Sequence, residues 1–146
     1  MKTIEILEKL ICFDTVSANP NLNLINWCAA LIEDAGGDVT LIPDPTGKKA
    51  NLYATIGPKD RAGVMLSGHT DVVPVEGQAW TKPPFKLTLK DGKYFGRGTC
   101  DMKGFVASAL AAGLNAAKRD LHTPLHLAFS YDEEIGCIGV RSLLDM

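Results

Sequence analysis

Three short stretches of this sequence combine side chains that could bind a metal ion or move a proton. They are Gly68-His69-Thr70-Asp71, Gly96-Arg97-Gly98-Thr99-Cys100-Asp101 and Asp132-Glu133-Glu134. Imidazole and carboxylate groups without thiolates form the donor set of a hydrolytic zinc site. Each stretch taken alone also has a purely structural explanation, so the elements that position them decide between the two.

The first stretch follows Gly63 to Ser67, a predicted strand. Its run Val64-Met65-Leu66 is continuously apolar, which is typical of a central strand buried on both faces. If the backbone stays extended beyond it, His69 and Asp71 project to the same side. A carboxylate can then fix the histidine tautomer and raise its basicity as a metal ligand. The alternative is a structural histidine beside a capping aspartate.

The second stretch precedes the longest predicted helix, Met102 to Arg119. Two glycines permit an unusual backbone path and place Asp101 near the start of this helix. An aspartate there could simply stabilise the helix dipole. Phosphate binding is set aside, because the Walker spacing is missing and Lys103 falls in the wrong place for it.

The third stretch follows the alternating strand Leu125 to Phe129. Consecutive carboxylates repel one another unless cations or hydrogen bonds offset the repulsion, although a solvated acidic loop is an alternative. In an α/β layered domain, ligands gather where strands end, so the three stretches should converge there. His122 and His126 lie away from these strand ends, and we expect them to be structural or surface residues.

Local patterns predict the remaining elements. A helix over residues 4–11 has apolar residues at helical spacing, and a second helix begins at Asn19-Pro20 and stops at Gly36-Gly37. Asp91-Gly92 predicts a hairpin turn between residues 85–89 and 93–95. The long helix is apolar nearly all round, so it should pack inside. Further strands are predicted over residues 39–42 and 51–56, and the start of a helix over Val140 to Met146.

Composition indicates one ordered domain of 146 residues, with 46% hydrophobic and 22% charged residues. The net charge of -2 and the absence of a basic stripe argue against a nucleic-acid partner. Phe105 to Leu114 is too short an apolar stretch for a membrane span of about 20 residues. Glu5 stands where a secretory signal needs an apolar core, so we expect a cytoplasmic protein without a membrane partner.

The 4 cysteines contain no C-x-x-C pair, so we expect thiols rather than a zinc knuckle or a redox motif. Cys12 and Cys28 are expected to be small buried apolar residues. Cys100 and Cys137 lie beside candidate site residues, and their role stays open.

Extended along the chain, the three stretches become longer motifs: Ser67 to Pro74, Gly96 to Gly104 and Asp132 to Gly136. In this order they closely resemble the acetylornithine deacetylase and succinyl-diaminopimelate desuccinylase family of di-zinc amidohydrolases. The resemblance runs from the first helix to the last residue. It implies a three-layer α/β/α zinc-peptidase-like catalytic domain, of which residues 1–146 form an incomplete N-terminal part. The rest of that domain, and a second domain for dimerisation and substrate binding, would then be absent from this chain.

The resemblance also implies a role for each matching residue. His69 would bind the first zinc ion, Glu134 the second, and Asp101 both; cobalt could substitute. Asp71 would orient His69, and Glu133 would act as general base and then general acid. A cis peptide bond between Asp101 and Met102 is implied as well.

Within the family, Cys100 and the loop Val75 to Trp80 look most like acetylornithine deacetylases. The expected reaction is hydrolysis of N-acetyl-L-ornithine, a small N-acyl amino acid, to L-ornithine and acetate in arginine biosynthesis, by a homodimeric parent protein. Alternatives are a succinyl-diaminopimelate desuccinylase, another N-acyl-amino-acid amidohydrolase or dipeptidase, and a non-catalytic binding or assembly module of the same fold. Because His69, Asp101 and Glu134 leave each ion short of ligands, we expect this chain alone to be inactive and to hold zinc weakly.

Overall fold

The computed structural model describes residues 1–145, which form a four-stranded sheet, a small hairpin and four helices. The strand order in the sheet is β1-β2-β6-β3. β2 runs antiparallel to both of its neighbours, whereas β3 runs parallel to β6, so the carboxyl ends of β3 and β6 lie side by side. The bounds are Asp38–Pro43 for β1, Ala50–Ile56 for β2, Val64–His69 for β3 and Leu125–Ser130 for β6.

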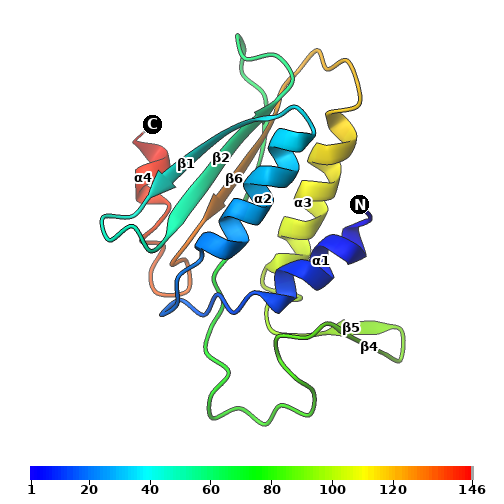
Figure 1. Ribbon diagram of the computed structural model, residues 1–146, viewed down its shortest axis with the longest axis vertical. Helices are drawn as coiled ribbons and strands as arrows, with labels where there is room; N and C mark the ends of the chain where they lie inside the picture. The colour runs from blue at the N-terminus through cyan, green and yellow to red at the C-terminus, as the bar shows by residue number, and fades with distance from the viewer. Residues whose placement is uncertain (146) are drawn as a thin grey trace.

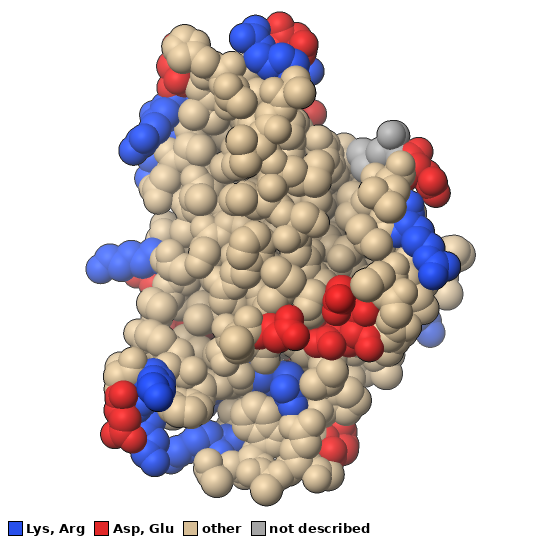
Figure 2. Space-filling model, turned by 180° about the vertical axis from the view of Figure 1, so that it is seen from behind, with Lys and Arg blue, Asp and Glu red and all other residues tan. Residues whose placement is uncertain are grey.

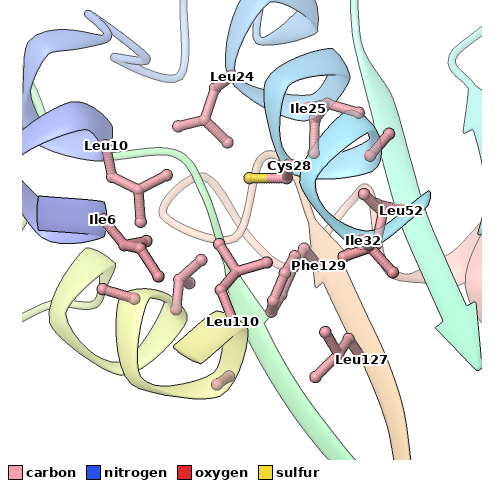
Figure 3. Packing of buried hydrophobic residues seen from close by; sticks show 14 of the residues in the cluster. Ile6, Leu10, Leu24, Ile25, Cys28, Ile32, Leu52, Leu110, Leu127 and Phe129 are labelled. Atoms are coloured by element: carbon pink, nitrogen blue, oxygen red, sulfur yellow. The ribbon is translucent and has the colours of Figure 1, made fainter. Parts of the chain in front are cut away.

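Three helices cover one face of this sheet: α1 (Thr3–Cys12), α2 (Leu22–Asp34) and α3 (Lys103–Ala116) (Figure 1). Their apolar side chains meet those of β2 and β6 in a single core that includes Leu10, Leu110 and Phe129 (Figure 3). The short α4 (Arg141–Leu144) lies on the opposite face, where it lines a hollow with Tyr53 and Ala128. The expected mixed α/β architecture is therefore confirmed.

The predicted helices form, with shifted ends. In α1 the buried residues Ile6, Leu7, Leu10 and Ile11 follow helical spacing. α2 begins at Leu22, so the predicted start at Asn19-Pro20 is wrong. The N-cap residue is Asn21, whose side chain bonds to both the N–H and the carbonyl of Ala50 and so ties α2 to the start of β2.

Two further helix predictions need correction at their ends. The long helix begins one residue later than expected and ends at Ala116, so Lys118 and Arg119 lie beyond it. The expected helix from Val140 to Met146 is present as α4, but Met146 lies outside the described residues.

The prediction that β3 is a central strand buried on both faces is wrong. Within residues 1–145, β3 is an edge strand that pairs only with β6, and Val64 and Met65 are 57% and 53% exposed. The central positions belong to β2 and β6. An apolar run therefore predicted the strand correctly but not its place in the sheet.

The predicted hairpin consists of β4 (Thr88–Lys90) and β5 (Lys93–Phe95), and it projects from the body of the molecule (Figure 1). Asp91 and Gly92 both have positive φ values, 50° and 72°, as a tight two-residue hairpin turn requires. Of the two cysteines expected to be buried, Cys28 is buried and Cys12 is exposed. Cys12 falls outside the buried stripe of α1, so that expectation is corrected.

None of the helices within residues 1–145 combines the length and the apolar character needed to cross a membrane.

Candidate metal centre

The candidate site lies where β3 and β6 end. His69 is the last residue of β3 and is in register with Ser130, the last residue of β6. Glu133 and Glu134 follow β6 in a loop in which Asp132 has a φ of 54° and the N–H of Gly136 donates to the carbonyl of Glu133. Parallel pairing of the two strands thus brings an imidazole and an acidic loop to the same edge of the sheet.

The ring of His69 is buried and held at both nitrogens. Nδ1 lies 2.9 Å from the backbone oxygen of Asp71 and 3.5 Å from its Oδ1. The carbonyl can only accept, so Nδ1 is the donor and Nε2 faces the site. Nε2 lies 3.1 Å from Asp101 Oδ1 and 3.6 Å from Glu133 Oε2. Residues from three distant parts of the chain therefore meet at this nitrogen.

The surroundings of His69 favour a positive charge. Burial acts to lower the pKa of His69, but hydrogen bonds with Asp71 and Asp101 outweigh it and raise the pKa to about 9. The field that favours a proton on Nε2 also favours a metal cation at the same place.

The carboxylates at the site repel one another. Burial raises the pKa of Glu134, and the nearby carboxylates raise it further against the opposing effect of His69. One ligand atom each from His69, Glu133 and Glu134 lie within 4.8 Å of one another. A divalent cation would relieve this repulsion, and imidazole with carboxylates is the donor set that zinc accepts. The residues present therefore fit a metal site.

Figure 2 shows a group of acidic side chains in the middle of a largely uncharged face of the molecule. This is the side of the sheet that α1, α2 and α3 leave uncovered (Figures 1 and 2). A small polar substrate could approach the carboxylates from this side.

Asp71 connects the end of β3 to the acidic loop. Its carboxylate accepts hydrogen bonds from the backbone N–H groups of Glu133 (3.0 Å) and Glu134 (3.3 Å) and from the hydroxyl of Ser17. Burial acts to raise the pKa of Asp71, but hydrogen bonds from His69, Ser17 and these N–H groups outweigh it and hold the pKa below its ordinary value. The sequence predicted only the contact with His69, which the Asp71 carbonyl makes more closely than the carboxylate.

Asp132 does not join the other two acidic residues. Its carboxylate forms a largely buried ion pair with Lys49, which lies just before β2. The three consecutive acids are thus separated, because Lys49 neutralises the first and only Glu133 and Glu134 face His69. Sequence reasoning missed both Ser17 and Lys49, because no local pattern marks contacts with residues so distant along the chain.

Asp101 reaches the site from the entry to α3, and its side chain is 73% exposed. The Asp101–Met102 peptide bond is cis, as the resemblance implied. Gly98 has a φ of 82°, and a Cβ there would lie 2.7 Å from Val72 Cγ1, so only glycine fits this approach.

The other candidate residues lie around or outside the site. Cys100 is exposed, and the thiol of Cys137 lies 3.6 Å from Glu133 Oε1. His126 bonds to Tyr53 and Thr55 on the uncovered face of the sheet, and His122 is exposed. Neither of these two histidines is part of the cluster found among the described residues.

Residues 65–146 match peptidase family M20/M25/M40. The chain belongs to this family. Its relatives include an acetylornithine deacetylase from Myxococcus xanthus, 40% identical over 95% of this chain, and another from Shigella sonnei, 39% identical over 94%. The present chain spans only 37% of the length of the first of these proteins and 38% of the length of the second.

The fold agrees with membership of the M20/M25/M40 family. An M20 family metallo-carboxypeptidase from Sulfolobus solfataricus superposes with a TM-score of 0.85, at 21% sequence identity. The superposition covers 99% of this chain and 34% of that protein. At 21% identity this structural similarity supports the fold alone. The evidence for the chemistry therefore comes from the residues of the site.

Proposed function

We propose that the protein carrying this chain is a metal-dependent amidohydrolase that converts N-acetyl-L-ornithine to L-ornithine and acetate, a step of arginine biosynthesis. The observation that carries the proposal is the convergence of His69, Asp101, Glu133 and Glu134 at the ends of β3 and β6. The names of the two relatives near 40% identity support the choice of substrate.

In this proposal His69 and Asp101 hold one zinc ion, and Asp101 and Glu134 hold a second. Bound there, such ions would polarise a carbonyl group and acidify water. Asp71 keeps the His69 ring fixed through Nδ1, so that Nε2 stays directed at the site. The chain's own contribution is to bring these ligand atoms together from the ends of β3 and β6 and the entry to α3.

Glu133 is the residue best placed to move protons. Its Oε2 lies 3.6 Å from His69 Nε2, and 42% of its side chain is exposed, so it can reach both the site and a substrate. It would take a proton from the attacking water and then deliver it to the departing amine nitrogen. Amide hydrolysis needs that second transfer, because an amine anion is a poor leaving group.

The ligands named here are few for two ions, since a catalytic zinc usually has three protein ligands. We therefore propose that residues 1–146 form the N-terminal part of a larger metal-dependent catalytic domain. Expressed alone, this chain should bind zinc weakly and show no turnover. The full-length protein would supply further ligands and act as a homodimer.

The test is hydrolysis by the full-length protein loaded with zinc or cobalt. N-acetyl-L-ornithine should be cleaved with a higher kcat/KM than N-succinyl-diaminopimelate or a dipeptide. A preference for either competitor would replace the proposed substrate and keep the class of reaction. A metal-loaded protein that cleaves none of them, nor any other N-acyl amino acid, would instead be a non-catalytic module of the same fold.

A further inference from the structure

Ser17 lies in the loop between α1 and α2, far in sequence from every residue of the candidate site. This loop is fixed to the segment after β3 by an isolated parallel bridge between Val16 and Val72. Val72 N–H donates to the carbonyl of Thr15 (3.0 Å), and Ser17 N–H donates to the carbonyl of Val72 (3.2 Å). The backbone of Ser17 therefore has a fixed position relative to Asp71.

The Ser17 hydroxyl donates a 2.6 Å hydrogen bond to Asp71 Oδ2. Both residues are buried, with 6% and 2% exposure, so water is a poor substitute for this donor. The same Oδ2 accepts from Glu134 N–H, while Oδ1 accepts from Glu133 N–H. One orientation of the carboxylate satisfies all three donors.

Lys49 also connects the loop that carries Ser17 to the acidic loop after β6. Its ammonium group donates to the carbonyl of Ser17 and to the carboxylate of Asp132. Asp132 directly precedes Glu133, so the loop that carries Ser17 and the loop that carries the glutamates share one partly buried cation. These contacts leave little freedom for either loop to move independently.

We propose that Ser17 is a positioning residue for the metal site: its hydroxyl fixes the Asp71 carboxylate, which holds the backbone of Glu133 and Glu134 in place. The inference rests on the proposed function, because it assigns Ser17 a role toward the same metal ligands. Without the hydroxyl, the buried carboxylate keeps a lone pair unsatisfied and can rotate away from the glutamate N–H groups. Groups that orient metal ligands typically affect metal affinity by about 10–100-fold.

The test compares Ser17→Ala with Thr15→Val in the full-length protein. Thr15 is a matched control, because its buried hydroxyl also makes a 2.6 Å bond across to the end of β3, but to the carbonyl of Thr70. Zinc and cobalt dissociation constants are measured by chelator competition, together with the free energy of unfolding. Ser17→Ala should weaken metal binding about 10-fold or more and lower kcat with little change in KM. Thr15→Val should lower stability but keep metal affinity within about twofold.

Ser17→Thr, which keeps the hydroxyl, should restore most of the metal affinity. If Ser17→Ala does not fold, Ser17→Cys replaces it, because a thiol keeps the shape but donates weakly. Unchanged metal affinity in a folded Ser17 variant would overturn the inference, and so would an equal loss in Thr15→Val. Failure of the unmodified protein to bind metal would instead refute the proposed function.

Discussion

The carboxylates that follow β3 and β6 differ in how their negative charges are balanced. Asp132 is neutralised by Lys49 and buried, whereas the neighbouring Glu133 is 42% exposed and, within residues 1–145, makes no ion pair except its 3.6 Å approach to His69. Asp71 is saturated by donors from Ser17 and the acidic loop. Of these three carboxylates, only Glu133 keeps oxygen atoms available for proton transfer.

Replacing Glu133 by glutamine should remove the proton acceptor and keep the shape of the side chain. We expect kcat for N-acetyl-L-ornithine in the full-length protein to fall by about 10²–10⁴-fold, the usual contribution of general acid–base catalysis. Metal content, measured by elemental analysis, should be retained. Glu134→Gln is the matched control, and it should lose metal affinity as well as activity. Near-normal turnover in Glu133→Gln would remove Glu133 from the proton-transfer role.

Asp44, which lies away from the candidate site, makes a pH-dependent contribution to the stability of the fold. Its carboxylate accepts bonds from the Thr46 hydroxyl (2.6 Å) and from the N–H groups of Lys48 and Lys49 (both 2.9 Å), which close the β1–β2 turn. Burial acts to raise the pKa of Asp44, but these hydrogen bonds outweigh it and lower the pKa below 3.8. Ionised Asp44 therefore stabilises the fold above its unfolded pKa, and this stabilisation is lost as the pH falls through the folded pKa.

Asp44→Asn should accordingly be less stable than the unmodified protein near neutral pH. The difference in free energy of unfolding should shrink as the pH falls below about 4, because protonation removes the charge from the original side chain. Urea unfolding at several pH values measures this difference in free energy. Asp120→Asn is the control, because it removes the same charge from an exposed position. A difference independent of pH would mean that the ionised carboxylate is not responsible.

Among the helices, α1 and α3 are joined by a buried lysine. Lys103, at the first turn of α3, is completely buried, and its ammonium group donates to the carbonyls of Leu10 (3.0 Å) and Phe13 (2.7 Å). The Leu10 carbonyl also accepts the N–H of Phe13 (3.2 Å), so Lys103 gives it a second donor, and the Phe13 carbonyl belongs to the residue that directly follows α1. Lys103 thus completes α1 and fixes it against the start of α3, close to Asp101.

Lys103→Ala should destabilise the protein by about 2–5 kcal/mol, because it leaves a cavity and removes the ammonium donor from the carbonyls of Leu10 and Phe13. Relief of the burial of a charged amine opposes this loss, since burial lowers the pKa of Lys103 to about 8. The cavity and the loss of these two hydrogen bonds should outweigh that relief. Chemical denaturation measures the change, and Lys118→Ala, at an exposed position beyond α3, should cost less than about 0.5 kcal/mol. Equal costs would show that the buried ammonium contributes nothing specific.

Local sequence patterns predicted where helices, strands and turns form better than they predicted which of these elements lie next to one another. Helical spacing located α1, a long stretch rich in alanine and leucine located α3, and Asp91-Gly92 located the hairpin, because these features depend on residues close in the chain. Convergence of the first and third motifs could be predicted because carboxyl ends of neighbouring parallel strands share an edge, and the second motif was expected there because it precedes a helix of the same layered domain. The edge position of β3 and the contacts of Ser17 and Lys49 depend on strand order and loop packing, which no local spacing encodes.

At the scale of the whole molecule, the two faces of the sheet differ. One is covered by α1, α2 and α3, whereas the other carries α4 and a hollow of about 460 Å³ lined by residues that include Tyr53, Met65 and Leu144. Beside this hollow β3 presents an unpaired edge within residues 1–145, with Val64 and Met65 exposed. An open strand edge next to an apolar surface is a template for association with another chain.

The 146-residue chain expressed alone should therefore self-associate through the edge of β3. Met65→Lys places a charge at this edge, where lysine opposes strand pairing, and should shift the chain toward monomer without unfolding it. Sedimentation velocity at several concentrations measures the shift, and circular dichroism verifies the fold. Leu89→Lys is the matched control, because Leu89 is 61% exposed but lies on the hairpin, away from the sheet edge. If both variants reduced association equally, added charge in general would be responsible, and a chain that is monomeric without any substitution would refute association at this edge.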